Sequence, residues 1–292
     1  MDDVMIFGEG IERVGVRPIT DNIYWITHCL GDCANQYYAD YFAALPEKEQ
    51  YDYHKNVDYP FSSFLIVDEK TLLVDTQAPT QRASTMQALE YILGDRELDY
   101  IWISHIEIPH AGNAPAIIER YPNARIVTTK GGDHYYPLHG LDNAMQVEAG
   151  DVLELGEHSL EMIDAVFVDH GFSQWAIERK SGMFISIDWG HNLHDAARGQ
   201  CYMFMDEMME TTDYNEEVYL NDVKVNYWYQ FPWLAFTDAD EIADAVDNIF
   251  AQHDIRILAP SHGNIIRKNV DHYVPLLREA MRRAVAIPYK FE

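Results

Sequence analysis

A short apolar segment, DYIWIS (99–104), runs directly into the residues HIEIPH (105–110). His105 and Glu107 are two residues apart, so in an extended segment their side chains point the same way. His110 follows one short turn later. Open α/β sheets place their chemistry at the carboxyl ends of strands, which is where these three side chains fall. The segment therefore predicts a strand that ends in a metal site.

Residues of the same kind follow three other apolar segments of the chain. His170 comes after VFVD, Asp188 closes MFISID, and His262 comes after ILAPS. A single histidine at a strand end is usually a hydrogen-bonded cap or surface residue. Three such strand ends, together with the HxExxH cluster, indicate that all of them meet at one metal site. The candidate metal ligands are His105, Glu107, His110, His170, Asp188 and His262.

The order of the apolar segments predicts an α/β fold built from two similar halves. In the first half the pattern predicts strands at 22–27, 62–68, 71–76, 99–104 and 124–129, and helices at 84–94 and 114–121. In the second half it predicts strands at 159–168, 174–179, 183–188 and 255–260, and helices at 201–210, 239–253 and 269–284. Two β-rich halves with helices outside them predict an αββα four-layer sandwich. No linker separates the halves, so we expect residues 1–292 to form a single domain, with a core at about 20–268 and a C-terminal helix at 269–284.

The charge of the chain limits its partners. It carries 21 basic and 48 acidic residues, a formal charge of −27. A field of that sign repels phosphate backbones, so nucleic acid is not an expected partner. No apolar run reaches the roughly 18–20 residues of a membrane span, and the acidic N-terminus differs from a secretory signal. We expect a cytoplasmic protein that acts on a small molecule and does not bind membranes, and the sequence is compatible with a homo- or hetero-oligomer.

Two further features have more than one interpretation. The cysteines, Cys29, Cys33 and Cys201, are too few for a disulfide framework. They fit ordinary buried thiols better than the soft metal ligands that His28-Cys29-x3-Cys33 would offer. The segment 218–236 is unusually aromatic, which fits either core packing or the wall of a pocket for a flat apolar substrate.

Together these residues resemble the metallo-β-lactamase superfamily, and most closely the di-iron domain of flavodiiron proteins. That family carries H-x-E-x-D-H, then a histidine, a bridging aspartate and a final histidine. The resemblance covers roughly residues 20–268. SSFLIVDEKTLLVDT is similar to the family's opening hairpin, VNYWYQFPW to its aromatic segment, and LAPSHGNIIR to its final ligand loop. The resemblance implies a metallo-β-lactamase-like αββα fold with a dinuclear metal site.

The resemblance also implies which residues hold the two divalent metal ions, iron or zinc. Metal one would take His105, Glu107 and His170, and metal two His110 and His262, with Asp188 bridging. The chain departs from the family at Pro109, where the family has an aspartate. The second metal is therefore expected to be weakly held, or completed by water, by substrate, or by His191 or His194, unless the site holds one metal only. With two carboxylates (−2) and two divalent ions (+4), the site would carry +2.

Metal-activated hydrolysis is the function that the sequence favours. A metal-bound hydroxide would attack a small ester or ether, aromatic in view of 218–236, with Asp188 and His262 as the catalytic residues. This reaction needs no electrons. The roughly 30 residues after His262 leave no room for the family's flavodoxin domain, so no flavin is expected in this chain. Ser104 and Ser261 precede ligand histidines and are expected to position loops rather than to act as nucleophiles.

Two redox alternatives remain open. Glu107 stands where hydrolases of the superfamily usually have a histidine, and a carboxylate suits iron better than another imidazole does. This residue favours a flavodiiron-like oxidoreductase that reduces O2 or NO with a separate electron donor. A di-iron oxygen sensor would use the same ligands.

Overall fold

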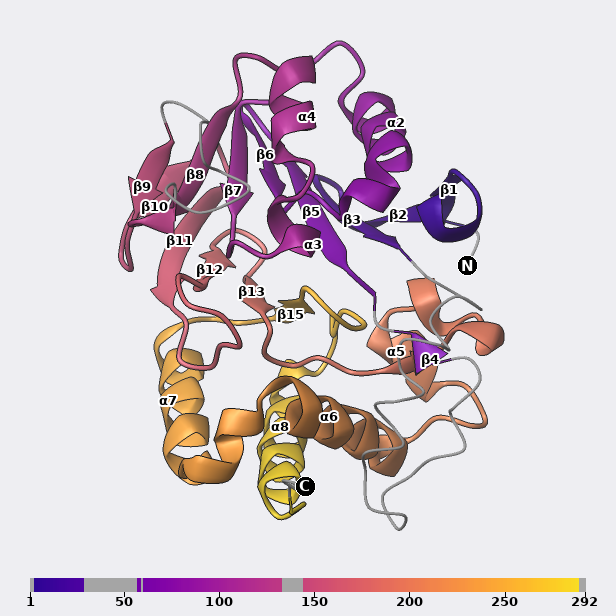
Figure 1. The fold of residues 1–292 in the computed structure, drawn as a ribbon, viewed down its shortest axis with the longest axis vertical. Helices are drawn as coiled ribbons and strands as arrows, with labels where there is room; N and C mark the ends of the chain where they lie inside the picture. The colour runs from indigo at the N-terminus through magenta and orange to yellow at the C-terminus, as the bar shows by residue number, and fades with distance from the viewer. Residues whose placement is uncertain (1–2, 29–56, 59, 133–143, 289–292) are drawn as a thin grey trace.

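An eight-stranded sheet forms the N-terminal half of the protein in the computed structural model, which describes residues 3–28, 57–58, 60–132 and 144–288 (Figure 1). The strand order is β1-β2-β3-β5-β6-β7-β8-β9. Neighbours from β1 to β6 are antiparallel, and those from β6 to β9 are parallel. The strands are β1 Met5–Phe7, β2 Val14–Thr20, β3 Ile23–His28, β5 Ser62–Val67, β6 Thr71–Val74, β7 Tyr100–Ile103, β8 Arg125–Thr129 and β9 Met145–Val147.

A five-stranded sheet with the order β10-β11-β12-β13-β15 packs against the first. Its strands are antiparallel except for the parallel pair of β13 and β15. Two short strands, β4 (Val57–Asp58) and β14 (His194–Asp195), pair separately. The strands of the five-stranded sheet are β10 Val152–Glu154, β11 Ser159–Asp164, β12 Gln174–Glu178, β13 Met183–Ile187 and β15 Ile257–Pro260.

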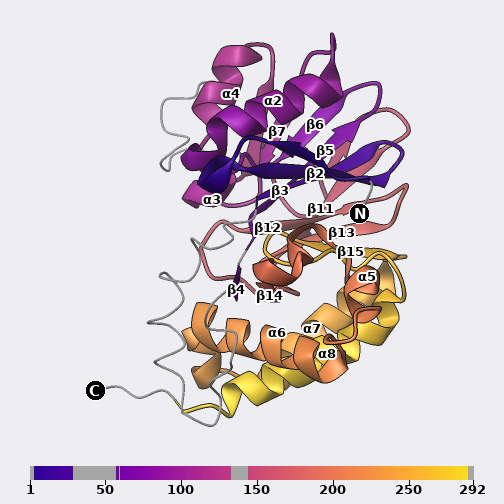
Figure 2. The same cartoon turned by 90° about the vertical axis from the view of Figure 1, so that its right-hand side faces the viewer.

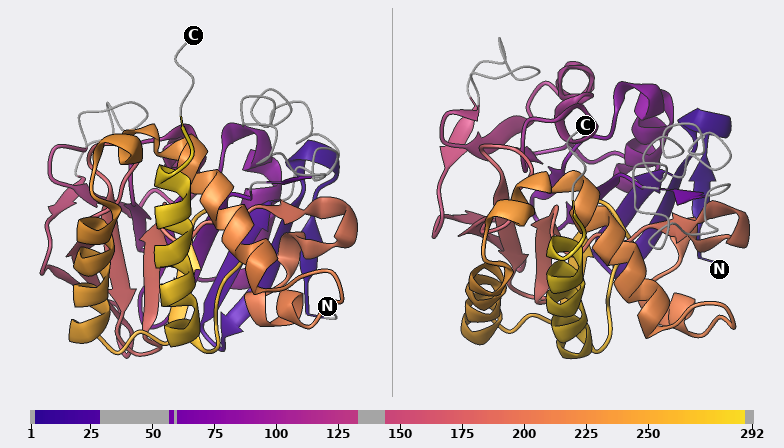
Figure 3. Two further views of the ribbon diagram at one scale, coloured as in Figure 1. Left: turned by 90° about the horizontal axis from the view of Figure 1, so that it is seen from below. Right: turned by 60° about the horizontal axis from the view of Figure 1, so that its bottom comes forward.

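Helices cover the outer face of each sheet, so the molecule has the four layers of a metallo-β-lactamase-like αββα sandwich (Figure 2). Seen from the side of the second sheet, α6, α7 and α8 lie over its strands (Figure 3). The helices on the first sheet are α2 Arg82–Leu93, α3 Ile108–Ala111 and α4 Ala114–Arg120. The later ones are α5 Met205–Met209, α6 Glu216–Gln230, α7 Ala239–Gln252 and α8 Val270–Val285. Short 3-10 turns are η1 Gly10–Glu12, η5 Pro79–Gln81, η7 Ala196–Arg198, η8 Gln200–Tyr202 and η9 Pro232–Phe236.

The central strands β6 and β7 of the first sheet are buried on both faces, which explains why they are mostly apolar. Successive side chains of a strand point to opposite faces. On β7, Trp102 joins the core between the sheets, whereas Ile101 and Ile103 pack under α2 and α4. Leu72 and Leu73 of β6 divide in the same way. This double burial fixes the strand ends from which the site is built.

The predicted helix at 201–210 is shorter than expected. Residues 200–202 form a 3-10 turn, and α5 begins only at Met205. Phe204 is extended, and its N–H donates to the Glu207 carboxylate at 3.0 Å, which starts the helix there. Arg17 also holds the preceding turn, because its guanidinium donates to the Tyr202 carbonyl at 2.7 Å.

The aromatic segment forms α6 and the turn η9. Asn215 caps α6 by accepting hydrogen bonds from Glu217 and Val218. Tyr227 and Phe231 are fully buried and pack on Phe167. Core packing, one of the two interpretations of this segment, therefore accounts for these rings. No helix in the described part of the chain is long and apolar enough to cross a membrane.

Candidate metal centre

The loop after β7 turns the HIEIPH residues toward the interior. The backbone N–H and the hydroxyl of Ser104 both donate to the Asp75 carboxylate, at 2.9 and 2.8 Å, and fix the start of the loop. The His105 Nε2 atom then lies 3.8 Å from the Glu107 carboxylate. Pro109 occupies the first turn of α3, where a missing N–H costs nothing. The proline therefore starts the short helix that carries His110.

Two hydrogen bonds from outside the centre orient the next histidines. The His110 Nδ1 atom lies 2.7 Å from the Asp75 carboxylate, and Nδ1 of His262 donates to the Pro60 carbonyl at 2.9 Å. Each bond sets the tautomer and directs the Nε2 atom toward the centre. Burial acts to lower the pKa of His110, but the Asp75 carboxylate prevails and raises it. Asp75 was not among the residues predicted for the site, although it follows the apolar segment TLLV at the same sheet edge as His105.

Ligand-type atoms of seven residues converge in three overlapping groups. In each group, one ligand atom per residue lies within 4.8 Å of the others. His105 and Asp188 each belong to two groups, so the groups form one continuous centre. The groups are His105 with His110 and Asp188, Asp188 with His191 and His262, and His105 with Glu107 and Asp169.

All the predicted ligands except His170 fall within these groups. The ring centroid of His170 is 6.4 Å from that of His105, and its Nδ1 donates to the Gly171 carbonyl at 2.8 Å. Asp169, the preceding residue, is part of the centre in its place. His191 is also there, whereas His194 lies in another cluster. The assignment of ligands remains a prediction that metal analysis tests.

The unpaired atoms at the centre fit a metal site. Nε2 of His105, Nε2 of His110 and one Asp169 oxygen are buried, and no hydrogen-bond partner reaches them among the described residues. Both oxygens of Asp188 also lack a donor as long as the carboxyls around them are ionised. Leaving a buried polar atom unpaired costs about 1–3 kcal/mol. Imidazole and carboxylate atoms that face one another without partners are what a bound cation would satisfy.

The electrostatics of the centre also favour a cation. Burial and the charge of Asp169 raise the pKa of Asp188 well above its usual value. The Asp169 and Asp188 carboxyls are close enough to share a proton, so they repel each other when both are ionised. Burial lowers the pKa of His191 to about 4 and holds that of His262 well below its usual value. A cation between the carboxylates would relieve the repulsion, and neutral imidazoles can donate to it.

Asp169 changes the expected charge of the centre. Sequence analysis counted two carboxylates, Glu107 and Asp188. The structure adds a third, so the ligand-type carboxylates contribute −3. Two divalent ions (+4) would leave +1 rather than +2. The loss of an aspartate at Pro109 is therefore offset in charge by a residue from a different strand end.

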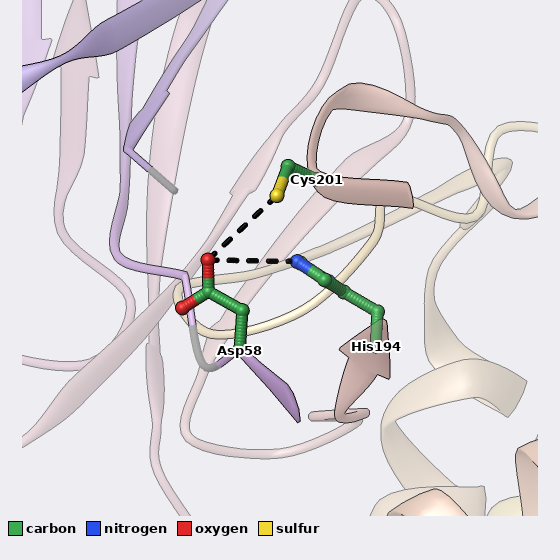
Figure 4. Close-up of side chains that lie close together, drawn as sticks. All are labelled: Asp58, His194 and Cys201. Atoms are coloured by element: carbon green, nitrogen blue, oxygen red, sulfur yellow. Dashed lines mark hydrogen bonds and ion pairs between the residues drawn. The ribbon is translucent and has the colours of Figure 1, made fainter. Parts of the chain in front are cut away.

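A second cluster, made of Asp58, His194 and Cys201, lies where β4 and β14 pair (Figure 4). The Asp58 carboxylate is 4.0 Å from Nε2 of His194 and 3.7 Å from Sγ of Cys201. Cys201 is disulfide-bonded, so its sulfur is not a thiolate ligand. The expectation of a free buried thiol is therefore wrong for Cys201. Cys29 and Cys33 lie outside the described residues.

The two serines before ligand histidines serve the loops. Ser104 binds Asp75 as described above. The Ser261 N–H donates to the Ile187 carbonyl at 2.8 Å, and its carbonyl accepts from Ser62 at 2.7 Å. These backbone bonds hold the ligand loop of His262 to both sheets. The Ser261 hydroxyl itself is buried with no hydrogen-bond partner among the described residues, so a positioning role of that side chain stays a prediction.

Comparison with known proteins agrees with the fold. Residues 57–181 match the model of the Metallo-beta-lactamase superfamily. A nitric oxide reductase of Moorella thermoacetica is 28% identical over 255 residues, which cover 86% of this chain and 57% of that protein. The flavodiiron protein of Giardia intestinalis has a TM-score of 0.65 and 17% identity, covering 92% of this chain and 59% of that one. Rubredoxin oxygen:oxidoreductase of Desulfovibrio gigas has a TM-score of 0.64 and 19% identity, covering 93% and 61%.

The fold is metallo-β-lactamase-like, and residues 57–181 match the model of that superfamily. Several structural neighbours are named flavodiiron proteins, so the chain resembles that family. The chain spans less than two thirds of the length of each of the three proteins named above.

These matches contradict the predicted hydrolase. The sequence relative is named a nitric oxide reductase, and a structural neighbour is named an oxygen:oxidoreductase, so the prediction of hydrolysis was wrong. The prediction had favoured hydrolysis because that reaction needs no electrons and no electron-delivering domain was expected in the chain.

Proposed function

We propose that this domain is a flavodiiron-like di-iron oxidoreductase that reduces O2 or NO with electrons supplied from outside the domain. The observation that carries the proposal is the set of buried, unpaired imidazole and carboxylate atoms at the ends of several strands. Carboxylates beside imidazoles suit iron better than a set made of imidazoles alone. The names of the relatives point to the same chemistry.

Each candidate ligand has a part in holding the pair of metals. Asp188 belongs to the groups on both sides of the centre and is placed to bridge them. Asp75 and the Pro60 carbonyl hold the rings of His110 and His262 from behind. When bound, iron would supply the redox chemistry. The protein supplies the fixed imidazoles and carboxylates that keep two ions at one place.

The centre opens to solvent on one side. The Glu107 side chain is 38% exposed, whereas those of His105, His110 and Asp188 are at most 2% exposed. A small diatomic substrate would therefore reach the centre past Glu107. The buried side keeps water away from the remaining ligands.

Gas consumption tests the proposal. The protein is purified anaerobically, loaded with Fe(II), supplied with a chemically reduced flavoprotein, and followed with oxygen and NO electrodes. We expect consumption of at least one gas, and none with zinc-loaded protein, because zinc has no redox chemistry. Equal rates for the iron and zinc forms would contradict the proposal.

A further inference from the structure

We propose that Asp169 and His191, which lie outside the ligand set predicted from the sequence, are metal ligands: Asp169 beside His105 and Glu107, and His191 beside Asp188 and His262. This inference rests on the dinuclear centre of the proposed function but not on the reaction that the centre carries out. It assigns a complete set of ligands to each metal position.

Asp169 is held with one oxygen toward the centre. Its other carboxylate oxygen accepts a hydrogen bond from Nε2 of Gln230 at 2.8 Å. The oxygen that faces the centre has no donor and lies 4.0 Å from Nε2 of His105. His170 is directed elsewhere, since its Nδ1 is bonded to the Gly171 carbonyl. At this strand end a carboxylate, not an imidazole, faces the metal position.

His191 is fully buried on the opposite side of the centre. Its Nε2 atom lies 3.9 Å from the Asp188 carboxylate, and its ring packs edge-on against that of His262 at 4.7 Å between centroids. Nδ1 faces the Gln230 carbonyl oxygen at 3.1 Å. That oxygen can only accept, and so can the Ile187 carbonyl oxygen near Nε2, so a neutral ring can donate to only one of the two.

The side-chain amide of Gln230 links Asp169 and His191, and its contact with Asp169 fixes the orientation of the amide. Its NH2 group donates to Asp169, so turning the amide around would set its oxygen against a carboxylate. In the fixed orientation the oxygen faces Nδ1 of His191. The Nε2 atom lies 2.6 Å from the Ile187 carbonyl, and a metal ion bound at Nε2 would take the place of the proton that this contact otherwise needs. One side chain on α6 therefore contacts both Asp169 and His191.

The two additions compensate for Pro109. Asp169 restores a carboxylate to the centre, and His191 adds an imidazole on the side where the aspartate at 109 would have bound. Metal one is then held by two carboxylates and one imidazole, and metal two by three imidazoles, with Asp188 between them. We therefore expect the second metal to be firmly bound rather than weakly held.

Metal content of neighbouring variants tests the inference in the iron- or zinc-loaded protein. Each pair changes one proposed ligand and one histidine close to it in sequence: Asp169→Asn with His170→Gln, and His191→Gln with His194→Gln. We expect Asp169→Asn and His191→Gln to fall from about two metal ions per chain to about one, while the neighbours stay near two. Asp169→Glu, which keeps the carboxylate, should recover part of the loss. Circular dichroism shows whether each variant is folded.

The reverse pattern, with metal lost in His170→Gln and kept in Asp169→Asn, would overturn the assignment. Full occupancy in His191→Gln would show that His191 is a protonated partner of Asp188 and not a ligand. Where a variant does not fold, a crystal structure of the zinc-loaded wild-type protein decides, because it shows the ligands directly. A wild-type protein that binds two ions through these residues but consumes no gas would contradict the function and leave the ligand assignment standing.

Discussion

The metal centre and the second cluster contain the same kinds of buried side chain but differ in how these are satisfied. At the centre, atoms of four residues are unpaired and face one another from several strand ends. In the second cluster Nε2 of His194 has no hydrogen-bond partner among the described residues, but its Nδ1 lies 3.1 Å from the Asn264 side-chain oxygen, and the Cys201 sulfur is in a disulfide. Burial and residue type alone therefore do not identify a metal site. Convergence of unpaired ligand atoms does.

Removing one carboxylate from each cluster tests most strongly whether only the metal centre binds metal. Asp188→Asn should lower metal affinity by about two orders of magnitude or more, because it takes away the ligand shared by both metal positions. Asp58→Asn, of similar size and equally buried, should leave metal content unchanged. Elemental analysis after dialysis measures both. Equal metal loss in the two variants would mean that the second cluster also holds metal.

A smaller effect is expected from the residue behind His110. Asp75→Asn weakens the bond that orients this ring and should reduce metal affinity by about 10- to 100-fold. The matched control is Glu178→Gln, since Glu178 is a buried carboxylate 3.0 Å from His158 and away from the centre. Chelator competition gives the affinities. If Asp75→Asn and Glu178→Gln lose metal equally, the orienting role of Asp75 is refuted.

The smallest effect concerns stability near the second cluster. Arg17 binds both the Tyr202 carbonyl, next to Cys201, and the Glu207 carboxylate, at 2.7 Å each. Glu207→Gln should lower the free energy of unfolding by about 1–2 kcal/mol at neutral pH and leave metal content intact. Urea unfolding measures it.

The pH dependence of that variant provides a further check. Burial acts to raise the pKa of Glu207, but the hydrogen bond from Arg17 prevails and lowers it. A lowered folded-state pKa means that the stabilisation is present above the usual value of 4.5 and is lost as the pH falls through the folded value. The difference between wild type and Glu207→Gln should therefore vanish in acid. A difference that persists unchanged in acid would show that packing, not charge, is lost.

Most of the centre was predictable because its residues follow regular strands. His105, Asp188 and His262 follow within two residues of the ends of β7, β13 and β15, so one strand end of the first sheet and two of the second meet at the centre. The choice between Asp169 and His170 was not predictable, because β11 ends at Asp164 and the alternation of faces is lost in the loop that follows.

The positions of His191 and Gln230 at the centre could not be predicted from the sequence, for other reasons. The chain leaves β13 through Ile187, whose φ of 52° is rare for a branched residue, and through Gly190, with φ of 90°. This turn brings His191 back under the strand end. Gln230 reaches the centre from the last residue of α6, and no pattern in the sequence marks it. The hydrolase prediction failed because it weighed residues thought to be missing more heavily than Glu107, which was present.

Mössbauer spectroscopy of protein loaded with ⁵⁷Fe tests the central claim, a redox-active dinuclear iron centre, most directly. We predict two iron sites of unequal environment, since one side of the centre is rich in carboxylates and the other in imidazoles, and we predict that both change oxidation state on reduction and on exposure to O2 or NO. A protein that holds a single iron, or iron that does not change oxidation state under these conditions, would contradict the account.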